Sequence, residues 1–179
     1  MKYIYKDKVF KKKIKIDLKR DEKLSQSRIM TIEYDSKRNA YISLLYYDNG
    51  KYKYILYPRG ILIGDIICNS NLFIGSAKKL TKISPGTYVH NIEIIPGRGG
   101  QLVRAAGTSA KIISEDSFFF KLRLPSGKIS FFFKTSKVTV GQVGNIESKN
   151  IKLCKAGSKI WLGKRPKVRK KAMNPIDQI

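Results

Sequence analysis

The sequence contains few of the residues from which metal and catalytic sites are usually built. Its 179 residues include a single histidine, His90, and two cysteines, Cys68 and Cys154, which lie far apart along the chain. A zinc site needs several Cys or His ligands at close spacing, and a disulfide framework needs a set of paired cysteines. A serine triad would have to use His90, and no pattern places a nucleophile beside it. We therefore expect no catalytic residues and no metal site, and we expect both thiols to be buried or inert.

Long apolar runs are also missing. No run approaches the roughly 18 residues of a membrane-spanning helix, and the N-terminus has no signal-peptide core. The chain shows neither a basic amphipathic helix nor a lipidation signal, which are the features that would bring a basic protein to a membrane surface. We therefore expect no membrane partner.

Acidic residues are scarce. The chain has 13 Asp and Glu against 37 Lys and Arg, a formal charge of +24 that far exceeds what solubility requires. Such an excess indicates a polyanionic partner, above all a nucleic acid. Residues 1–23 contain ten basic residues and residues 151–179 contain nine. Lysine runs are often no more than solvated surface, but Trp161 among the tail's cations favours RNA, because an indole can stack on a base while its neighbours contact phosphates.

The hydrophobic residues are arranged in short runs typical of strands, with turn signals between them. The expected strands cover residues 28–34, 41–47, 51–57, 64–67, 87–94, 110–114, 117–124, 128–133 and 137–145. Asn49-Gly50 predicts a hairpin with a type I′ turn, and Pro125-Ser126-Gly127 predicts a second tight connection. No helix of ten or more residues alternates with the strands. The chain is therefore predicted to be all-β, with two small barrels joined near residue 75 or, alternatively, one larger barrel.

Two further expectations follow from local patterns. Strict alternation over residues 87–94 places His90 on one face with Tyr88, Ile92 and Ile94, which predicts a core or interface histidine and not a catalytic base. The segment 151–179 has no apolar periodicity that could build a core, and its glycines and prolines argue against one continuous helix. We expect this tail to become ordered on a partner.

The glycine-rich run 96–110, PGRGGQLVRAAGTSA, is the one candidate for a nucleotide-binding loop. A Walker loop fails because Gly100 and Gly107 have the wrong spacing and Thr108 stands where the lysine belongs. A dinucleotide fingerprint fails because Leu102 occupies the position of its last glycine. The adjacent acids Glu115 and Asp116 fall at a turn, where solvated carboxylates are common. The sequence therefore predicts no enzyme and no cofactor.

Several phrases of the chain, in order, carry a family resemblance. They are TIEYDSKRNAYISLLYYDNG, KYKYILYPRGILIGD, SPGTYVHNIEIIPGRGGQLVRAAGTSAKI, LPSGKISFF, VTVGQVGN and KAGSKIWLGKRPKVRKKAMNPID. From about Lys11 to Asp177 the chain resembles large ribosomal subunit protein two, in its bacterial and organellar branch. The resemblance implies an OB-fold barrel followed by an SH3-like barrel, with a basic extended C-terminal tail. The domains would then be a basic segment with an OB-fold RNA-binding domain (1–75), the SH3-like barrel (76–150) and a basic rRNA-binding extension (151–179).

The resemblance also implies a function. The chain is expected to be a structural constituent of the large ribosomal subunit, binding its rRNA and other ribosomal proteins and supporting assembly and the architecture around the peptidyl-transferase region. Alternatives are a free-standing OB-fold protein that binds single-stranded nucleic acid and, more remotely, an enzyme acting on nucleic acid. The predicted RNA contacts are Arg98, Arg104, Trp161, Lys164, Arg165, Lys167, Arg169 and Lys170. The glycines of 97–107 would let backbone N–H groups approach the RNA, or would serve backbone geometry alone.

The chain departs from the family pattern at both ends. The family begins upstream with a basic, glycine-rich arm, and it continues beyond the MNPID phrase into a histidine-containing loop, whereas Gln178 and Ile179 follow here. We therefore expect a polypeptide truncated at both ends, without a direct role in peptidyl transfer, and hypothesise that a separately encoded C-terminal fragment supplies the remainder. The chain is biased toward Lys, Ile, Tyr, Phe and Asn, as AT-rich codons produce. This bias and the truncation favour a mitochondrial ribosome, with a plastid ribosome as the alternative.

Overall fold

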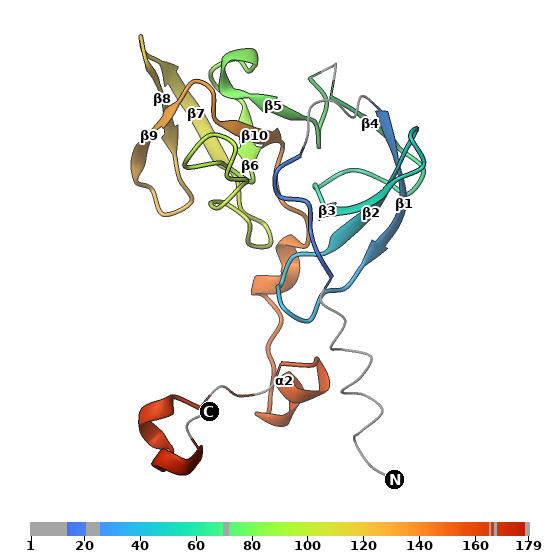
Figure 1. Ribbon diagram of the computed structural model, residues 1–179, viewed down its shortest axis with the longest axis vertical. Coiled ribbons are helices and arrows are strands. Elements are labelled where there is room, and N and C mark those ends of the chain that lie inside the picture. Colours follow the sequence, from blue (N-terminus) through green and yellow to red (C-terminus); the bar gives the residue numbers. More distant parts are fainter. Residues whose placement is uncertain (1–13, 21–25, 70–71, 165, 167, 178–179) are drawn as a thin grey trace. The chain divides into compact units, whose positions relative to one another are not determined.

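The computed structural model describes residues 14–20, 26–69, 72–164, 166 and 168–177 (Figure 1). Residues Ile14–Asn150 form one compact unit, and the described residues from Ile151 onward belong to a second. The first unit holds the two sheets found among the described residues, and the two units are described separately.

The first sheet packs one face on a small apolar core. Its strands are β1 (Gln26–Glu33), β2 (Ile42–Tyr47), β3 (Tyr52–Leu56) and β4 (Ile66–Cys68), paired antiparallel in the order β3-β2-β1-β4. The core residues are Ile29, Leu45, Tyr47, Ile55, Ile61 and Ile67. A bulge between Ile29 and Thr31 interrupts the pairing of β1 with β2. Such bulges bend a strand, and this one contributes to the curvature that a small barrel needs.

The turn between β2 and β3 differs from its prediction. The hairpin itself is confirmed, but its loop has three residues, Asp48 to Gly50, because the Tyr47 N–H donates to the Lys51 carbonyl oxygen at 3.0 Å. The Gly50 N–H donates to the Tyr47 oxygen at 2.9 Å, and Gly50 alone has a positive φ, of 75°. A type I turn followed by one left-handed residue needs no positive φ at Asn49, so the predicted type I′ turn is wrong.

The second sheet encloses the larger core. Its strands are β5 (Ala77–Lys79), β6 (Tyr88–His90), β7 (Ala110–Glu115), β8 (Phe119–Arg123), β9 (Ile129–Phe133) and β10 (Lys137–Val140), in the order β5-β10-β6-β7-β8-β9. Two 3-10 turns, η1 (Leu80–Lys82) and η2 (Ile146–Lys149), accompany it. The buried cluster comprises Leu80, Ile83, Val89, Ile92, Ala110, Ile112, Phe120, Leu122, Phe132, Val138 and Val140.

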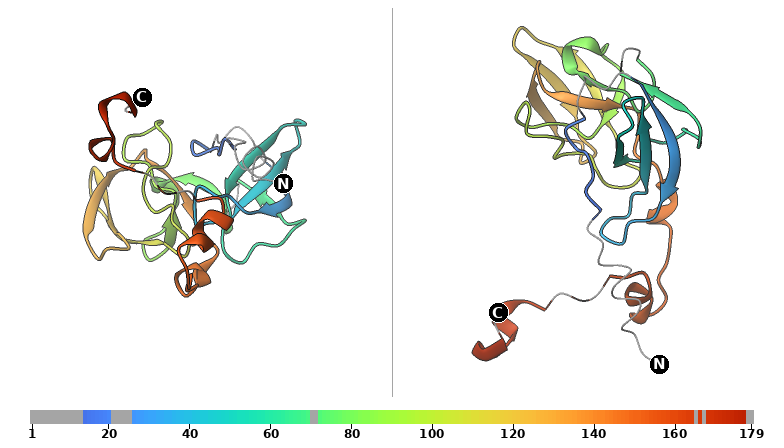
Figure 2. Two further views of the ribbon diagram at one scale, coloured as in Figure 1. Left: turned by 90° about the horizontal axis from the view of Figure 1, so that it is seen from below. Right: turned by 45° about the vertical axis from the view of Figure 1, so that its right-hand side comes forward.

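The two sheets confirm the predicted all-β fold, an OB-fold barrel followed by an SH3-like barrel. Each sheet has its own core, so the alternative of one larger barrel is wrong. Figure 2 shows the two sheets as neighbouring lobes of the first unit. The strand β5 lies in a stretch where the sequence indicated none, because it is only three residues long and two of them are lysines. The predicted domain boundaries stay predictions.

Backbone pairing joins the two sheets. The segment after β3 and the segment after β10 meet at an antiparallel bridge between Pro58 and Val143. The Gly144 N–H donates to the Tyr57 carbonyl oxygen at 2.8 Å. A third apolar cluster lies here, made of Ala40, Ala106 and Val143. Residues far apart in the sequence therefore build a common seam between the lobes.

The N-terminal segment of this unit, residues 14–20, also lies against both sheets. The Asp17 N–H donates to the Tyr54 carbonyl oxygen of β3 at 2.8 Å, and the buried Arg20 donates from Nη2 to the Gly75 oxygen, next to β5, at 2.7 Å. Burial lowers the pKa of Arg20, although the nearby Asp17 acts in the opposite direction. Burial alone would raise the pKa of Asp17, but hydrogen bonds from Lys53 and from the Arg20 backbone leave it below its ordinary value. Arg20 is thus a structural cation that does not reach the surface.

His90 is buried, as predicted, but not by strict alternation. Val89 and His90 are both buried, whereas Tyr88 and Ile94 are exposed. The strand β6 ends at His90 because Asn91 adopts a left-handed conformation with φ 52°. The residues after Asn91 therefore no longer continue the alternation on which the prediction depended.

A pH dependence of stability follows from His90. Its Nδ1 lies 2.9 Å from the Gly141 carbonyl oxygen, which can only accept, so Nδ1 carries the proton. Burial lowers its pKa from 6.5 to about 4, against the hydrogen bond to Gly141, which raises it, while nearby Arg20 lowers it further. Between these pH values the unfolded chain binds more protons. The free energy of unfolding should therefore fall by about 3 kcal/mol as the pH drops from about 6.5 to 4.

Urea denaturation across this pH window tests the assignment. In the His90→Gln variant the part of the pH dependence that arises between pH 6.5 and 4 should disappear. A variant with the same slope as the parent would contradict the assignment, since Asp17, with its lowered pKa, loses its stabilising effect only at lower pH.

The second unit has little regular structure. Its elements are α2 (Gly157–Trp161), η3 (Lys170–Ala172) and η4 (Pro175–Asp177). No continuous helix runs through the described part of the tail, and none of the side chains described there is fully buried. Its ordering on a partner stays a prediction. Cys68 is half-buried and Cys154 is exposed, and neither forms a disulfide among the described residues. The expectation that both thiols are buried or inert stays a prediction for Cys154. No helix among the described residues is long and apolar enough to cross a membrane.

Candidate nucleic-acid interface

The glycine-rich run forms a closed loop between β6 and β7. An isolated bridge pairs Ile92 with Leu102, and the Asn91 N–H donates to the Val103 carbonyl oxygen at 2.9 Å. These paired segments, 91–92 and 102–103, are the two arms of the loop. The predicted contact Arg98 is exposed in the turn between the two arms. Arg104 is half-buried and directly follows the second arm. The described residues offer no ion-pair partner to either guanidinium.

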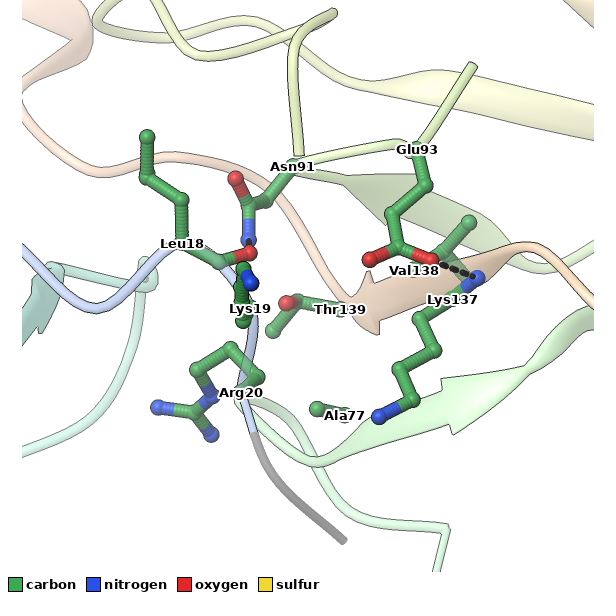
Figure 3. Close-up of a pocket in the computed structure, with 9 residues that line it drawn as sticks. All are labelled: Leu18, Lys19, Arg20, Ala77, Asn91, Glu93, Lys137, Val138 and Thr139. Carbon is green, nitrogen blue, oxygen red and sulfur yellow. Dashed lines mark hydrogen bonds between the residues drawn. The ribbon is translucent and has the colours of Figure 1, made fainter. Parts of the chain in front are cut away.

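A buried carboxylate holds the loop together. The Glu93 side chain is only 1% exposed. Its Oε1 accepts a hydrogen bond from the Gly99 N–H at 3.0 Å, and its Oε2 accepts from the N–H groups of Gly97 at 3.2 Å and Lys137 at 3.0 Å. Figure 3 shows Glu93 facing Lys137 of β10 across this site. The loop that carries Arg98 is therefore fixed to the second sheet by charge-assisted hydrogen bonds.

Glu93 was not among the predicted site residues. It is a lone acid in an otherwise apolar run, and such a residue, if buried, needs hydrogen-bond donors. A lone acid in an apolar run is therefore the sequence pattern that could have identified Glu93 as a structural residue.

The N-terminal segment closes the other side of the loop. The Leu18 carbonyl oxygen accepts from the Gly100 N–H at 2.9 Å and from Asn91 Nδ2 at 3.3 Å. Leu18 and Asn91 lie side by side in Figure 3. Gly100 packs so closely on Asn91 that a Cβ there would lie 2.7 Å from the Asn91 carbonyl oxygen. A glycine is therefore required at this position by close approach, while Gly97 and Gly99 have positive φ values of 81° and 93°.

These contacts correct one part of the predicted mechanism. The N–H groups of Gly97 and Gly99 donate to Glu93, that of Gly100 donates to Leu18, and that of Gly107 donates to Val143 and Gly144. They are therefore not free to bind phosphate, and the reading in which the glycines serve backbone geometry fits the structure. The arginine side chains remain as the groups that can reach RNA.

The space beside the loop does not suit a nucleotide. A cavity of about 10 Å³ is lined by Asp17, Arg20, Ile55, Leu56, His90, Asn91 and Thr139. Small-molecule sites are typically on the order of hundreds of Å³. Within the described residues no group of three or more His, Cys, Asp or Glu could hold a metal ion.

The tail places one predicted aromatic beside a cation. Trp161, at the end of α2, is 62% exposed, and Lys155 Nζ lies 4.4 Å from its ring centroid. This cation–π contact leaves most of the indole accessible for stacking. Lys155 was not among the predicted contacts, although it lies only six residues before Trp161.

The remaining predicted tail contacts are placed in part. Lys164 is half-buried and Arg169 is exposed. Arg165 and Lys167 lie outside the described residues, as does the side chain of Lys170. These contacts stay predictions.

Comparison with protein families identifies the family to which the chain belongs. Residues 3–69 match the family described as "Ribosomal Proteins L2, RNA binding N-terminal domain", and residues 73–179 match "Ribosomal Proteins L2, C-terminal domain". The chain belongs to the ribosomal protein L2 family. The predicted family is thereby confirmed from sequence matches that cover both lobes and the tail.

Three relatives illustrate how close this L2 chain is to known members. Large ribosomal subunit protein uL2c of Huperzia lucidula is 52% identical over 90% of the chain and 59% of its own length. The uL2cz/uL2cy protein of Drimys granadensis is 52% identical over 91% of the chain and 61% of its own length. The uL2c protein of Psilotum nudum is 50% identical over 90% and 60%. The chain therefore spans about 60% of the length of these relatives.

The prediction of a mitochondrial ribosome is wrong. These relatives are of the uL2c type, chloroplast ribosomal proteins, and point to the plastid, which was the predicted alternative. An AT-rich composition is common to both kinds of organelle, so it could not distinguish them. The separately encoded C-terminal fragment stays a prediction.

Proposed function

We propose that this L2-family chain is a structural, rRNA-binding constituent of the large subunit of a plastid ribosome. It supports subunit assembly and the architecture around the peptidyl-transferase region, and it has no catalytic role. Its partners are large-subunit rRNA and neighbouring ribosomal proteins. The observation that carries the proposal is the family match across residues 3–69 and 73–179, and the charge of +24 agrees with it.

The loop that Glu93 and Leu18 hold in place suggests how the chain binds rRNA. Arg98 and Arg104 displace counterions from rRNA phosphates, which makes binding strongly salt-dependent. Because Glu93 and Leu18 already fix the loop, little backbone order has to be gained when Arg98 meets the RNA. Preorganisation of this kind increases affinity by lowering the entropic cost of binding. The tail adds Trp161 for stacking and Lys164, Arg165, Lys167, Arg169 and Lys170 for phosphate contacts.

Reversing the charge of both loop arginines tests this mechanism. We expect Arg98→Glu combined with Arg104→Glu to prevent stable incorporation into large subunits, measured by sucrose-gradient sedimentation, while the melting temperature of the isolated chain stays unchanged. The matched control reverses Lys51 and Lys82, two exposed lysines outside the loop, and alters the net charge equally. Normal incorporation of the arginine variant would contradict the contact assignment. A slow, salt-labile peak of the parent protein itself would instead favour the free-standing nucleic-acid-binding protein.

A further inference from the structure

The outer face of the second sheet carries exposed aromatic rings that its core does not use. Along β8 and β9 the inward residues Phe120, Leu122 and Phe132 are buried. The outward rings of Phe119, Phe131 and Phe133 are 38%, 61% and 50% exposed. Exposed rings gathered on one sheet face usually mark an interaction surface, because contact of apolar rings with water is unfavourable and a bound partner would remove it. We call this surface, with Tyr88, Lys111, Lys121, Arg123 and Ile129, the outer face.

Rings and cations alternate across the outer face. The register pairs Phe133 with Phe119, and their ring centroids are 5.3 Å apart. Lys121 is paired with Phe131, and its Nζ lies 5.7 Å from that ring centroid. The pattern continues toward the sheet's interior strands.

Two further strand pairs extend the pattern. Arg123 pairs with Ile129 on one side and with Lys111 on the other. Lys111 pairs with Tyr88, and its Nζ lies 5.9 Å from the centroid of that exposed ring. Each ring of the outer face therefore has a cation or a second ring beside it.

The charges of the outer face select the class of partner. Among the described residues Arg123 and Lys111 have no carboxylate within ion-pair distance. The acids nearby are Asp116, which contacts Lys121 at 3.2 Å, and Glu115, which contacts Lys134 at 2.7 Å. An apolar protein surface laid on this face would bury unpaired cations at a cost of several kcal/mol for each. A nucleic-acid strand satisfies both kinds of group, because its bases stack on rings while its phosphates meet the cations.

We propose that the outer face of β8 and β9 binds unpaired RNA bases by stacking on Phe131, Phe133 and Phe119, with Arg123, Lys111 and Lys121 meeting the phosphates. The inference rests on the proposed rRNA-binding function and adds to it a surface separate from the loop of Arg98. Every base has an apolar face, so such stacking tolerates different sequences. The site therefore takes a single-stranded or looped-out segment of RNA.

Photo-crosslinking of the full chain to a short oligouridylate that contains 5-iodouridine maps the stacked bases. We expect crosslinked peptides that contain Phe131 or Phe133. Crosslinks confined to the Arg98 loop and the Trp161 tail would overturn this inference and leave the proposed function intact. Absence of any binding or crosslink would overturn both.

Affinity measurements with the same oligouridylate over a series of salt concentrations provide a second test, because phosphate contacts contribute less at high salt. At high salt Phe131→Ala should bind about 5- to 150-fold more weakly than the parent, the loss expected for one stacked base. The salt dependence of its affinity should be unchanged. Arg123→Gln should instead reduce the slope of log affinity against log salt by about 0.7. The matched control is Phe118→Ala, whose ring is 77% exposed but precedes β8.

The comparison of the two phenylalanine variants decides the outcome. Because Phe131 lies outside the buried cluster, its removal should leave the melting temperature unchanged. Unchanged affinity of Phe131→Ala, or an equal loss in Phe118→Ala, would overturn the inference.

Discussion

Replacing Glu93 by alanine should lower the free energy of unfolding of the Ile14–Asn150 unit by about 3–5 kcal/mol. The change removes the acceptor for three backbone N–H groups, those of Gly97, Gly99 and Lys137. A buried donor left without a partner costs about 1–3 kcal/mol, which applies in full to the Gly99 N–H. The N–H groups of Gly97 and Lys137 are only partly buried, so entry of water lowers the total. The Glu93 N–H also donates to the Lys137 carbonyl oxygen at 3.0 Å, and this backbone pair is retained in the variant.

Urea denaturation measures the loss, and Glu93→Gln is the matched control. Glutamine keeps the volume and one acceptor oxygen, but its amide group places a donor against one of the three N–H groups, so its cost should be intermediate. Hydrogen exchange supplies a local readout, because the amides of Gly97 and Gly99 should exchange faster in the alanine variant. A cost below about 1 kcal/mol would show that the carboxylate does not hold the loop.

The strands were largely predictable, since their apolar residues recur within a few positions along the chain. The adjacent phenylalanines in SFFFKLRL and KISFFF show this, because strand alternation requires one ring to face inward and its neighbours outward. Glu93 was not predictable in the same way. Its partners lie four, six and 44 residues further along the chain, and only the folded structure brings Lys137 to it.

Local backbone conformation accounts for the other differences. The end of β6 depends on the left-handed Asn91, which is stabilised by contacts with Val103 and Leu18 that no local pattern reveals. The loop of the first hairpin has three residues and not two, a difference that the Asn49-Gly50 pair alone does not decide. For the candidate site, Arg98 and Arg104 were readable as cations in a glycine-rich loop. The sequence does not reveal that the glycine N–H groups already donate hydrogen bonds within the protein, because their acceptors come from three separate segments.

Replacing Gly100 by alanine should destabilise the same unit by about 3 kcal/mol, whereas Gly97→Ala should cost only about 1 kcal/mol. Gly100 does not have a positive φ, so its requirement is steric. A Cβ at Gly100 would lie 2.5 Å from Asn91 Cγ and 2.7 Å from the Asn91 carbonyl oxygen. Asn91 cannot withdraw without breaking its hydrogen bonds to Val103 and Leu18.

Gly97 is the matched control because it has the opposite properties. Its φ is 81°, and a Cβ there would meet no atom within 4 Å, so alanine introduces backbone strain alone. For a unit of this size, 3 kcal/mol corresponds to a melting temperature lower by roughly 6–12 °C. Thermal and urea unfolding of both variants measure the difference. If Gly100→Ala costs no more than Gly97→Ala, close packing of the loop on Asn91 is not what requires glycine at this position.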